Sequence, residues 1–343
     1  MQAILGKLAA RVDLSAAEAE SAMRVIMSGE ASPALIGSFL TGLRCKGETV
    51  EELLGCACAM RAFALPVRSR HALLVDTCGT GGDGAGTFNI STTAAIVVAA
   101  AGVPVAKHGN RAASSRCGSA DVLEALGVRV DLTPAEVGAC LDELGIGFLF
   151  AQTHHPAMRH VGPARRELGF RTVFNLLGPL CNPAGAQVQL VGVPEEGLLA
   201  PLAEVLLRLG TRRALLVHGA DGLDELTLGG PTRVVEAVAG GGSPVVAEVT
   251  PESAGLAGAP LGALRGGSAQ ENAAITLAVL AGEAGPRQDV VCLNAGAALL
   301  AAGAASDLAA GVARAREAIR GGAALRLLEA WRRHTAGCRG ASA

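Results

Sequence analysis

Residues 76–127, DTCGTGGDGAGTFNISTTAAIVVAAAGVPVAKHGNRAASSRCGSADVLEALG, decide the fold, because they place two glycine-containing loops behind two apolar runs. The run Leu73-Leu74-Val75 predicts a buried strand that ends just before the first loop. A second apolar run at 103–107 predicts the next strand, and the polar stretch 107–115 follows it. The small apolar residues between the runs predict a helix over 92–101. Alternation of strand and helix is typical of a mostly parallel sheet.

Both loops have the composition of an anion-binding site. Glycines let backbone N–H groups converge on a ligand, and the dipole of a following helix favours negative charge. The first loop, Gly79-Thr80-Gly81-Gly82-Asp83, leads to the polar helix start Asn89-Ile90-Ser91-Thr92. It matches neither the P-loop nor the dinucleotide-binding fingerprint. Its alternative interpretation is a flexible turn before a helix.

The second loop, KHGNRAASS at 107–115, carries two cations, a histidine and two hydroxyls, and its alternative interpretation is a solvated basic loop. Ligands of parallel α/β sheets bind beyond the carboxyl ends of the strands, which is where both loops lie. We therefore expect a polyanionic substrate that is held from two sides.

The composition sets broad limits on function. Of the 343 residues, 50% are hydrophobic and 17% are charged, which is typical of a folded globular chain. The net charge of −2 and the 2% of aromatic residues argue against a nucleic-acid-binding surface. The apolar runs are too short to cross a bilayer, the start of the chain lacks a signal-peptide pattern, and the nine cysteines show no zinc spacing. We expect a cytoplasmic protein that binds neither nucleic acid nor membrane.

Helical periodicity and capping patterns run through residues 1–64, and short apolar runs alternate with helices from Leu73 onward. The predicted strands are 73–76, 103–107, 147–151, 188–193, 214–218, 233–238 and 245–249. The predicted helices are 92–101, 120–126, 135–144, 198–209 and 271–282, with three more from 289 to 331. We expect an α/β fold with a mostly parallel sheet flanked by helices, hinged to a smaller all-helical domain. The expected boundaries are 1–66 for the helical domain, which the insertion 160–185 rejoins, and 70–343 for the α/β domain.

Three further patterns bear on chemistry. Asp224-Glu225 reads either as an ordinary surface turn or, beside two phosphate loops, as a magnesium site, because Mg²⁺ prefers one or two carboxylates plus substrate oxygens. His154-His155 lacks a third metal ligand at useful spacing and is expected in a pocket wall. Arg165 or Arg166 could pair with a substrate carboxylate. No covalent nucleophile and no general base stands out, so we expect catalysis by positioning and charge stabilisation.

These motifs resemble those of the anthranilate phosphoribosyltransferases. The resemblance rests on long ordered stretches along most of the chain. They are GTGGD at 79–83, NIST at 89–92, KHGNRAASS at 107–115, GSADVLEALG at 118–127, HHPAM at 154–158, RRELGFRTVFNLLGPLCNP at 165–183 and GLDE at 222–225.

The resemblance implies transfer of 5-phosphoribose from phosphoribosyl pyrophosphate (PRPP) to the amine of anthranilate, with two Mg²⁺ ions per site and a homodimer formed through the N-terminal helices. It places the active site at the hinge between the domains. The implied PRPP-binding residues are Gly79, Gly82, Asp83, Thr87, Asn89, Ile90, Ser91, Thr92, Lys107, His108, Gly109, Asn110, Arg111, Ala112, Ala113, Ser114, Ser115 and Ser119. The implied anthranilate-binding residues are Gly79, Asn110, Arg165, His108, Met158 and His155, and the implied metal ligands are Ser91, Asp224 and Glu225.

Two other functions remain open from the sequence. A pyrimidine nucleoside phosphorylase shares this architecture but cleaves nucleosides with phosphate and lacks the acid pair, so Asp224-Glu225 and the NIST stretch favour the transferase. A non-catalytic nucleic-acid-binding relative of the same fold would need a broad basic face, which the net charge of −2 disfavours.

Overall fold

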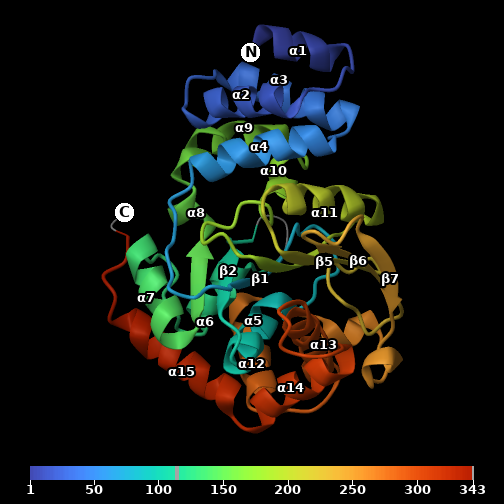
Figure 1. Ribbon diagram of the computed structural model, residues 1–343. Helices are drawn as coiled ribbons and strands as arrows, with labels where there is room; N and C mark the ends of the chain where they lie inside the picture. The colour runs from blue at the N-terminus through green and yellow to red at the C-terminus, as the bar shows by residue number, and fades with distance from the viewer. Residues whose placement is uncertain (113–115, 342–343) are drawn as a thin grey trace.

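The computed structural model describes residues 1–112 and 116–341, and it stacks helices, a sheet and more helices along one long axis (Figure 1). Four helices lead the chain: α1 (Gln2–Ala9), α2 (Ala16–Met27), α3 (Pro33–Lys46) and α4 (Val50–Ala62). The strands are β1 (Val75–Gly79), β2 (Val105–Gly109), β3 (Ile146–Phe150), β4 (Val188–Gly192), β5 (Arg213–Gly219), β6 (Thr232–Val238) and β7 (Val245–Val249).

The remaining helices lie between and after the strands. Those within the sheet region are α5 (Ile90–Ala100), α6 (Ser119–Ala125), α7 (Pro134–Leu144), α8 (Ala151–His154), α9 (Gly162–Leu168), α10 (Phe174–Leu177) and α11 (Leu199–Arg208). Those that follow it are α12 (Ala269–Leu280), α13 (Pro286–Ala301), α14 (Leu308–Arg320) and α15 (Ala323–Ala336).

The seven strands form one sheet in the order β3-β2-β1-β4-β5-β6-β7. The first five are parallel, and β6 and β7 add an antiparallel edge. The prediction of a mostly parallel sheet flanked by helices is confirmed. The strand order runs outward in opposite directions from β1 and from β4, so the loops after these central strands flank the switch point, where ligands of such sheets bind.

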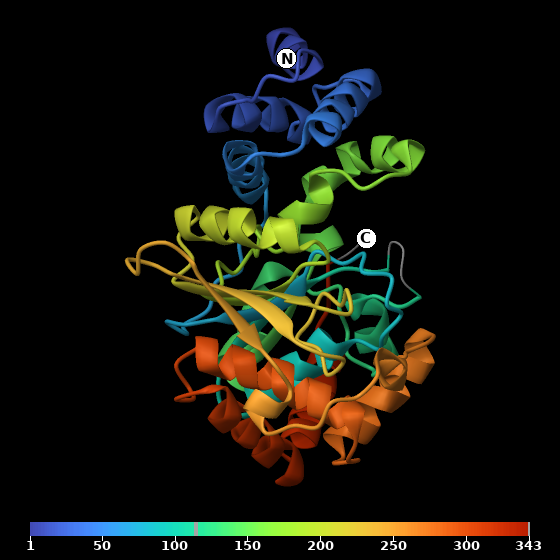
Figure 2. The same cartoon turned by 90° about the vertical axis from the view of Figure 1, so that its right-hand side faces the viewer.

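Alternate side chains of the strands enter two different cores. Leu215 and Val217 of β5 face the larger core with α5 and α13, whereas Leu216 faces the core beneath α11. Figure 2 shows α11 on one face of the sheet and the C-terminal helices on the other. Successive residues of a strand point to opposite faces of the sheet. Apolar residues at successive positions therefore identify a sheet that is buried on both sides.

The N-terminal helices continue the core beneath α11 away from the sheet. Helix α4 packs on α2 and on α11, and the segment after β3 returns to the bundle, where α9 contacts α3 and α10 contacts α4. The side chains of Leu53, Val161 and Leu177 all belong to this core. The helical layer therefore combines residues from the start of the chain with residues between β3 and β4.

Most predicted elements lie within two residues of the observed ones. The first strand is shifted: it covers Val75–Gly79, so Gly79 ends the strand instead of opening the loop. The backbone ladder with β4 extends that far, because Gly79 pairs with Gly192. Among the described residues, no helix is both long enough and apolar enough to cross a membrane.

Candidate active site

Two adjoining cavities open at the carboxyl ends of β1 and β2. A polar cavity of about 330 Å³ lies over the first residues of α5, and a larger, more apolar cavity of about 700 Å³ lies between the sheet and the helical layer. They share the wall formed by Cys78, Gly79 and residues 108–110. A ligand in one cavity would therefore meet a ligand in the other at this wall.

The glycine-rich loop after β1 follows a path that only glycine adopts easily. Gly81 and Gly82 have φ values of 63° and 92°, in the left-handed region. The N–H of Gly81 donates to Oδ2 of Asp224 at 3.1 Å, and the N–H of Thr80 donates to the carbonyl of Gly192 at 2.9 Å. The loop is thus anchored to β4 and to the segment after β5, far from it in sequence.

Three carboxyl groups meet in the polar cavity: Asp83, Asp224 and Glu225. Burial raises the pKa of Asp224 well above its ordinary value, and the charges of Asp83 and Glu225 raise it further. Burial also raises the pKa of Glu225 to about 7, although Lys107 and the N–H of Ser91, 3.0 Å from Oε1, favour its ionised form. Acids so close together in a partly buried pocket attract a cation or a proton.

Lys107 lies in β2 and lines the polar cavity. It is 3% exposed, and its ammonium donates to the carbonyl of Thr77. Asp76, also buried, accepts from the N–H of His108 at 3.1 Å and from the side-chain amide of Asn182 at 2.7 Å. Burial raises the pKa of Asp76, while Lys107 lowers it. These bonds fix the start of the second loop against the first strand.

Arg111 is engaged away from the first loop in this structure. Its two terminal nitrogens donate to the carboxylate of Glu124 at 2.6 and 2.7 Å, and one of them also reaches Asp121 at 3.1 Å. The guanidinium carbon lies 5.4 Å from the ring centre of Phe150. Both terminal nitrogens of Arg111 are therefore occupied by acidic side chains in this structure.

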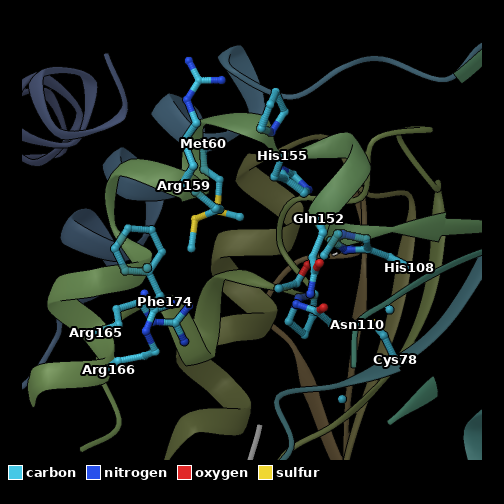
Figure 3. A pocket seen from close by; sticks show the side chains of 18 of the residues that line it. Met60, Cys78, His108, Asn110, Gln152, His155, Arg159, Arg165, Arg166 and Phe174 are labelled. Carbon is cyan, nitrogen blue, oxygen red and sulfur yellow. Dashed lines mark hydrogen bonds between the residues drawn. The ribbon is translucent and has the colours of Figure 1, made fainter. Parts of the chain in front are cut away.

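The larger cavity presents arginines opposite histidines (Figure 3). Arg165 lies in α9 with its guanidinium carbon 5.4 Å from the ring centre of Phe174, and burial lowers its pKa. Among the described residues, no acidic side chain lies within 4 Å to pair with it. A half-buried guanidinium that has no acidic partner in the described part of the chain is a receptor for a carboxylate.

The rings of His108 and His155 lie across from Arg165, with centroids 5.1 Å apart. Nδ1 of His108 donates to the carbonyl of Gly178 at 3.1 Å, which leaves Nε2 without a partner among the described residues. Burial, with a smaller contribution from His154, lowers the pKa of His155 to about 4, so the imidazole is neutral at pH 7. His154 itself bonds to the carbonyl of Phe150 and is a packing residue.

The structure brings the predicted site residues together. Those expected at PRPP and metal line the polar cavity, except Ala113, Ser114 and Ser115, which lie outside the described residues. Those expected at anthranilate all line the larger cavity. The side chain of Asn89 is already hydrogen-bonded within the protein. Its amide nitrogen donates to the carbonyl of Cys117, and its amide oxygen accepts from the side chain of Asn272.

Sequence reasoning missed several residues that line the cavities. Arg171, between α9 and α10, and Asn175, in α10, line the polar cavity. The buried hydroxyl of Thr80 in this cavity has no partner in the described part of the chain. Met60 and Phe174 line the larger cavity. Arg171 and Phe174 stand in the RELGFRTVFN stretch, so their motif drew attention, but nothing in it indicated which cavity each would face.

Hard oxygen donors make the polar cavity suitable for Mg²⁺. Within residues 1–112 and 116–341, no group of three or more His, Cys, Asp or Glu side chains could hold a metal ion by itself. Magnesium commonly keeps water and substrate oxygens among its six ligands, so two carboxylates and the Ser91 hydroxyl suffice once a phosphate is present. Because the pKa values of Asp224 and Glu225 are raised, a cation bound beside them would stabilise their ionised forms.

Comparison with known proteins agrees with this geometry. Residues 2–64 match the model of the glycosyl transferase family helical bundle domain, and residues 71–325 match that of its a/b domain. The chain is 56% identical to the anthranilate phosphoribosyltransferase of Symbiobacterium thermophilum over 343 residues, all of both chains. It is also 56% identical to that of Moorella thermoacetica over 330 residues, 96% of this chain and 97% of the relative.

Solved structures give the same result. The anthranilate phosphoribosyltransferase of Thermus thermophilus superposes with a TM-score of 0.92 at 51% identity, over 97% of this chain and 99% of that one. The Saccharomyces cerevisiae enzyme in complex with PRPP and Mg superposes with a TM-score of 0.89 at 29% identity, over 98% and 97%. The chain therefore belongs to this glycosyl transferase family and, within it, to the anthranilate phosphoribosyltransferases.

Proposed function

We propose that this chain transfers the 5-phosphoribosyl group of PRPP to the amine of anthranilate, giving N-(5-phosphoribosyl)anthranilate and pyrophosphate, a step of tryptophan biosynthesis. The observation that carries the proposal is the pair of cavities that meet at Gly79, His108 and Asn110. One cavity offers acids and donor-rich loops, and the other offers an unpaired arginine. That arrangement suits a polyanionic donor beside a small carboxylate acceptor.

PRPP would occupy the polar cavity. The backbone of the glycine-rich loop, the start of α5 and Lys107 would hold its charged groups, since N–H groups at a helix start and a buried ammonium both favour phosphate. Residues 107–115 and Ser119 would complete the grip, with Arg111 released from Glu124. The residues expected to bind PRPP thus line a cavity whose backbone N–H groups and cations suit its phosphates.

Ser91, Asp224 and Glu225 would hold Mg²⁺, and we propose two ions per site. When bound, Mg²⁺ stabilises the negative charge that develops on pyrophosphate. Asp83, in the same cavity, would help to orient the waters or phosphate oxygens around the second ion. The carboxylates serve as ligands only when ionised, so ion binding would drive protons off this group.

The reaction breaks the bond between ribose C1 and pyrophosphate oxygen, whose electron pair leaves with the pyrophosphate, and forms a bond from C1 to the amine nitrogen. The amine proton is then lost. An arylamine is neutral and nucleophilic at pH 7, so alignment supplies most of the rate gain, up to about 7–11 kcal/mol. Arg165 would bind the anthranilate carboxylate and aim the ortho amine at C1. Met158, His108 and His155 would shape the approach.

We also propose a homodimer that forms through the N-terminal helices. Ile4, Leu5 and Leu35 are partly buried apolar residues of α1 and α3, at the end of the molecule farthest from the sheet. Residues 1–66 with 160–185 would then move on a hinge against 70–343. Light scattering coupled to size exclusion tests the dimer, and a single-chain mass would exclude it.

Free thiols such as Cys56 and Cys181 suit a reducing cytoplasm.

The decisive experiment follows anthranilate fluorescence in the presence of PRPP and Mg²⁺. We expect loss of fluorescence, release of pyrophosphate in equal amount, and dependence on Mg²⁺. Thymidine with inorganic phosphate, tested in parallel, should give no thymine. Cleavage of thymidine together with stable anthranilate fluorescence would replace the transferase by a nucleoside phosphorylase.

A further inference from the structure

Arg171 connects the helical layer to the glycine-rich loop. It stands between α9 and α10, just after the left-handed Gly169 that ends α9. Its Nη2 donates to the carbonyl of Thr80 at 3.2 Å. The guanidinium also lies against Gly82, where an added Cβ would come within 1.5 Å of Nη1. Any side chain at position 82 would therefore displace Arg171.

The bond to Thr80 fixes one peptide unit at both ends. The carbonyl of the Thr80–Gly81 peptide accepts from Arg171, and its N–H donates to Oδ2 of Asp224 at 3.1 Å. A peptide is planar, so holding both groups fixes its rotation. The orientation of Asp224, a proposed metal ligand, is thus tied to Arg171 through a single peptide.

Arg171 is available for this role because no other strong contact engages it within residues 1–112 and 116–341. Among the described residues it has no carboxylate within 4 Å, whereas Arg111 is paired with Glu124. Arg171 also borders a small hollow that Glu48 and Glu195 line. Its side chain therefore spans the boundary between the two layers.

We infer that Arg171 is a positioning residue for PRPP and its metal: it holds the Thr80–Gly81 peptide in the orientation that keeps the loop open to pyrophosphate and Asp224 aimed into the polar cavity. The inference rests on the proposed function and extends it. Loss of Arg171 lets the peptide rotate, so it weakens binding at the PRPP end and leaves the carboxylate pocket around Arg165 in place.

The test compares Arg171→Ala and Arg171→Lys with Arg314→Ala. Arg314 is a matched control, because it also donates to backbone carbonyls, those of Ala101 and Ala304, in the opposite helical layer. Calorimetry measures binding of pyrophosphate with Mg²⁺, and steady-state kinetics measure KM for each substrate. Thermal unfolding checks that each variant is folded.

We expect Arg171→Ala to raise the Kd of Mg²⁺-pyrophosphate and the KM for PRPP about tenfold or more, the effect of one charge-assisted hydrogen bond. The KM for anthranilate should change much less. Arg171→Lys, which can still donate to Thr80, should recover part of the loss, and Arg314→Ala should match wild type in both quantities.

The inference is wrong if folded Arg171→Ala binds Mg²⁺-pyrophosphate like wild type, or if it raises both KM values equally. If Arg171→Ala does not fold, Arg171→Met decides on the same two quantities, because methionine keeps much of the side-chain length and cannot donate to Thr80. Wild-type enzyme that fails to consume anthranilate would instead overturn the proposed function, so the two failures are distinguishable.

Discussion

A Cβ atom on Gly192 would lie 1.5 Å from the carbonyl oxygen of Asp224. Gly192 ends β4, and its own carbonyl accepts the N–H of Thr80 at 2.9 Å. The same residue therefore touches the segment that carries the acid pair and anchors the glycine-rich loop. Such a close backbone approach requires the absence of a side chain at this position.

Gly192→Ala should remove most activity while the enzyme remains folded. The methyl group must push the backbone of Asp224 away, because no flexible side chain can yield in its place. We expect kcat/KM to fall more than a hundredfold, about 2.7 kcal/mol of transition-state stabilisation. Gly197→Ala is the control, since a Cβ there meets nothing within 4 Å. Equal activity of the two variants would show that the approach to Asp224 is not required.

Arg165→Ala should raise the KM for anthranilate much more than the KM for PRPP. Only anthranilate loses a partner, and loss of one charge-assisted contact corresponds to about a ten- to hundredfold change. Arg166→Ala should have a smaller effect, because Arg166 is exposed at the cavity edge. Steady-state kinetics with each substrate varied separately checks this. Parallel increases in both KM values would contradict the role of Arg165.

The double variant Asp224→Asn and Glu225→Gln should lose Mg²⁺-dependent turnover and remain folded. The amides keep the size and one acceptor oxygen of each acid, so the N–H groups of Gly81 and Ser91 retain partners. They lack the charge that Mg²⁺ requires. Chelation of metal from wild type should reproduce the loss reversibly. Turnover by the double variant at low Mg²⁺ would remove the pair from the metal site.

The helices and strands were predictable because their signals are local. Ser15 with Glu18 and Thr49 with Glu52 form the capping boxes that their spacing indicates, and both boxes are present. Apolar runs located the parallel strands, since a sheet buried on both faces needs continuous hydrophobic residues. The end of β1 was misplaced because a backbone ladder, not a side-chain pattern, extends it to Gly79.

The parts of the site that depend on tertiary packing were not predictable. No spacing in the sequence brings Gly192 against Asp224 or Arg171 against Gly82, because each contact joins segments that meet only in the folded chain. The composition of the second loop indicated that Arg111 is cationic, but not that Glu124 would hold its guanidinium. The polar residue types in the sequence indicated the chemistry of the ligands. Only the fold determined which other residues hold the ligand-binding side chains and loops in place.

The burial of His155 should make the enzyme sensitive to acid. Its pKa is about 4 in the folded chain, mainly because burial disfavours the charged ring, against an ordinary value of 6.5. The unfolded chain therefore takes up this proton first as the pH falls, so stability that is present above pH 6.5 is lost progressively down to about pH 4. The loss amounts to about 3 kcal/mol at most.

The variant His155→Asn lacks the titrating group. The free energy of unfolding of this variant, measured by urea titration from about pH 8 to about pH 4.5, should fall less steeply than that of wild type. Two parallel curves would mean that His155 does not set the acid limit.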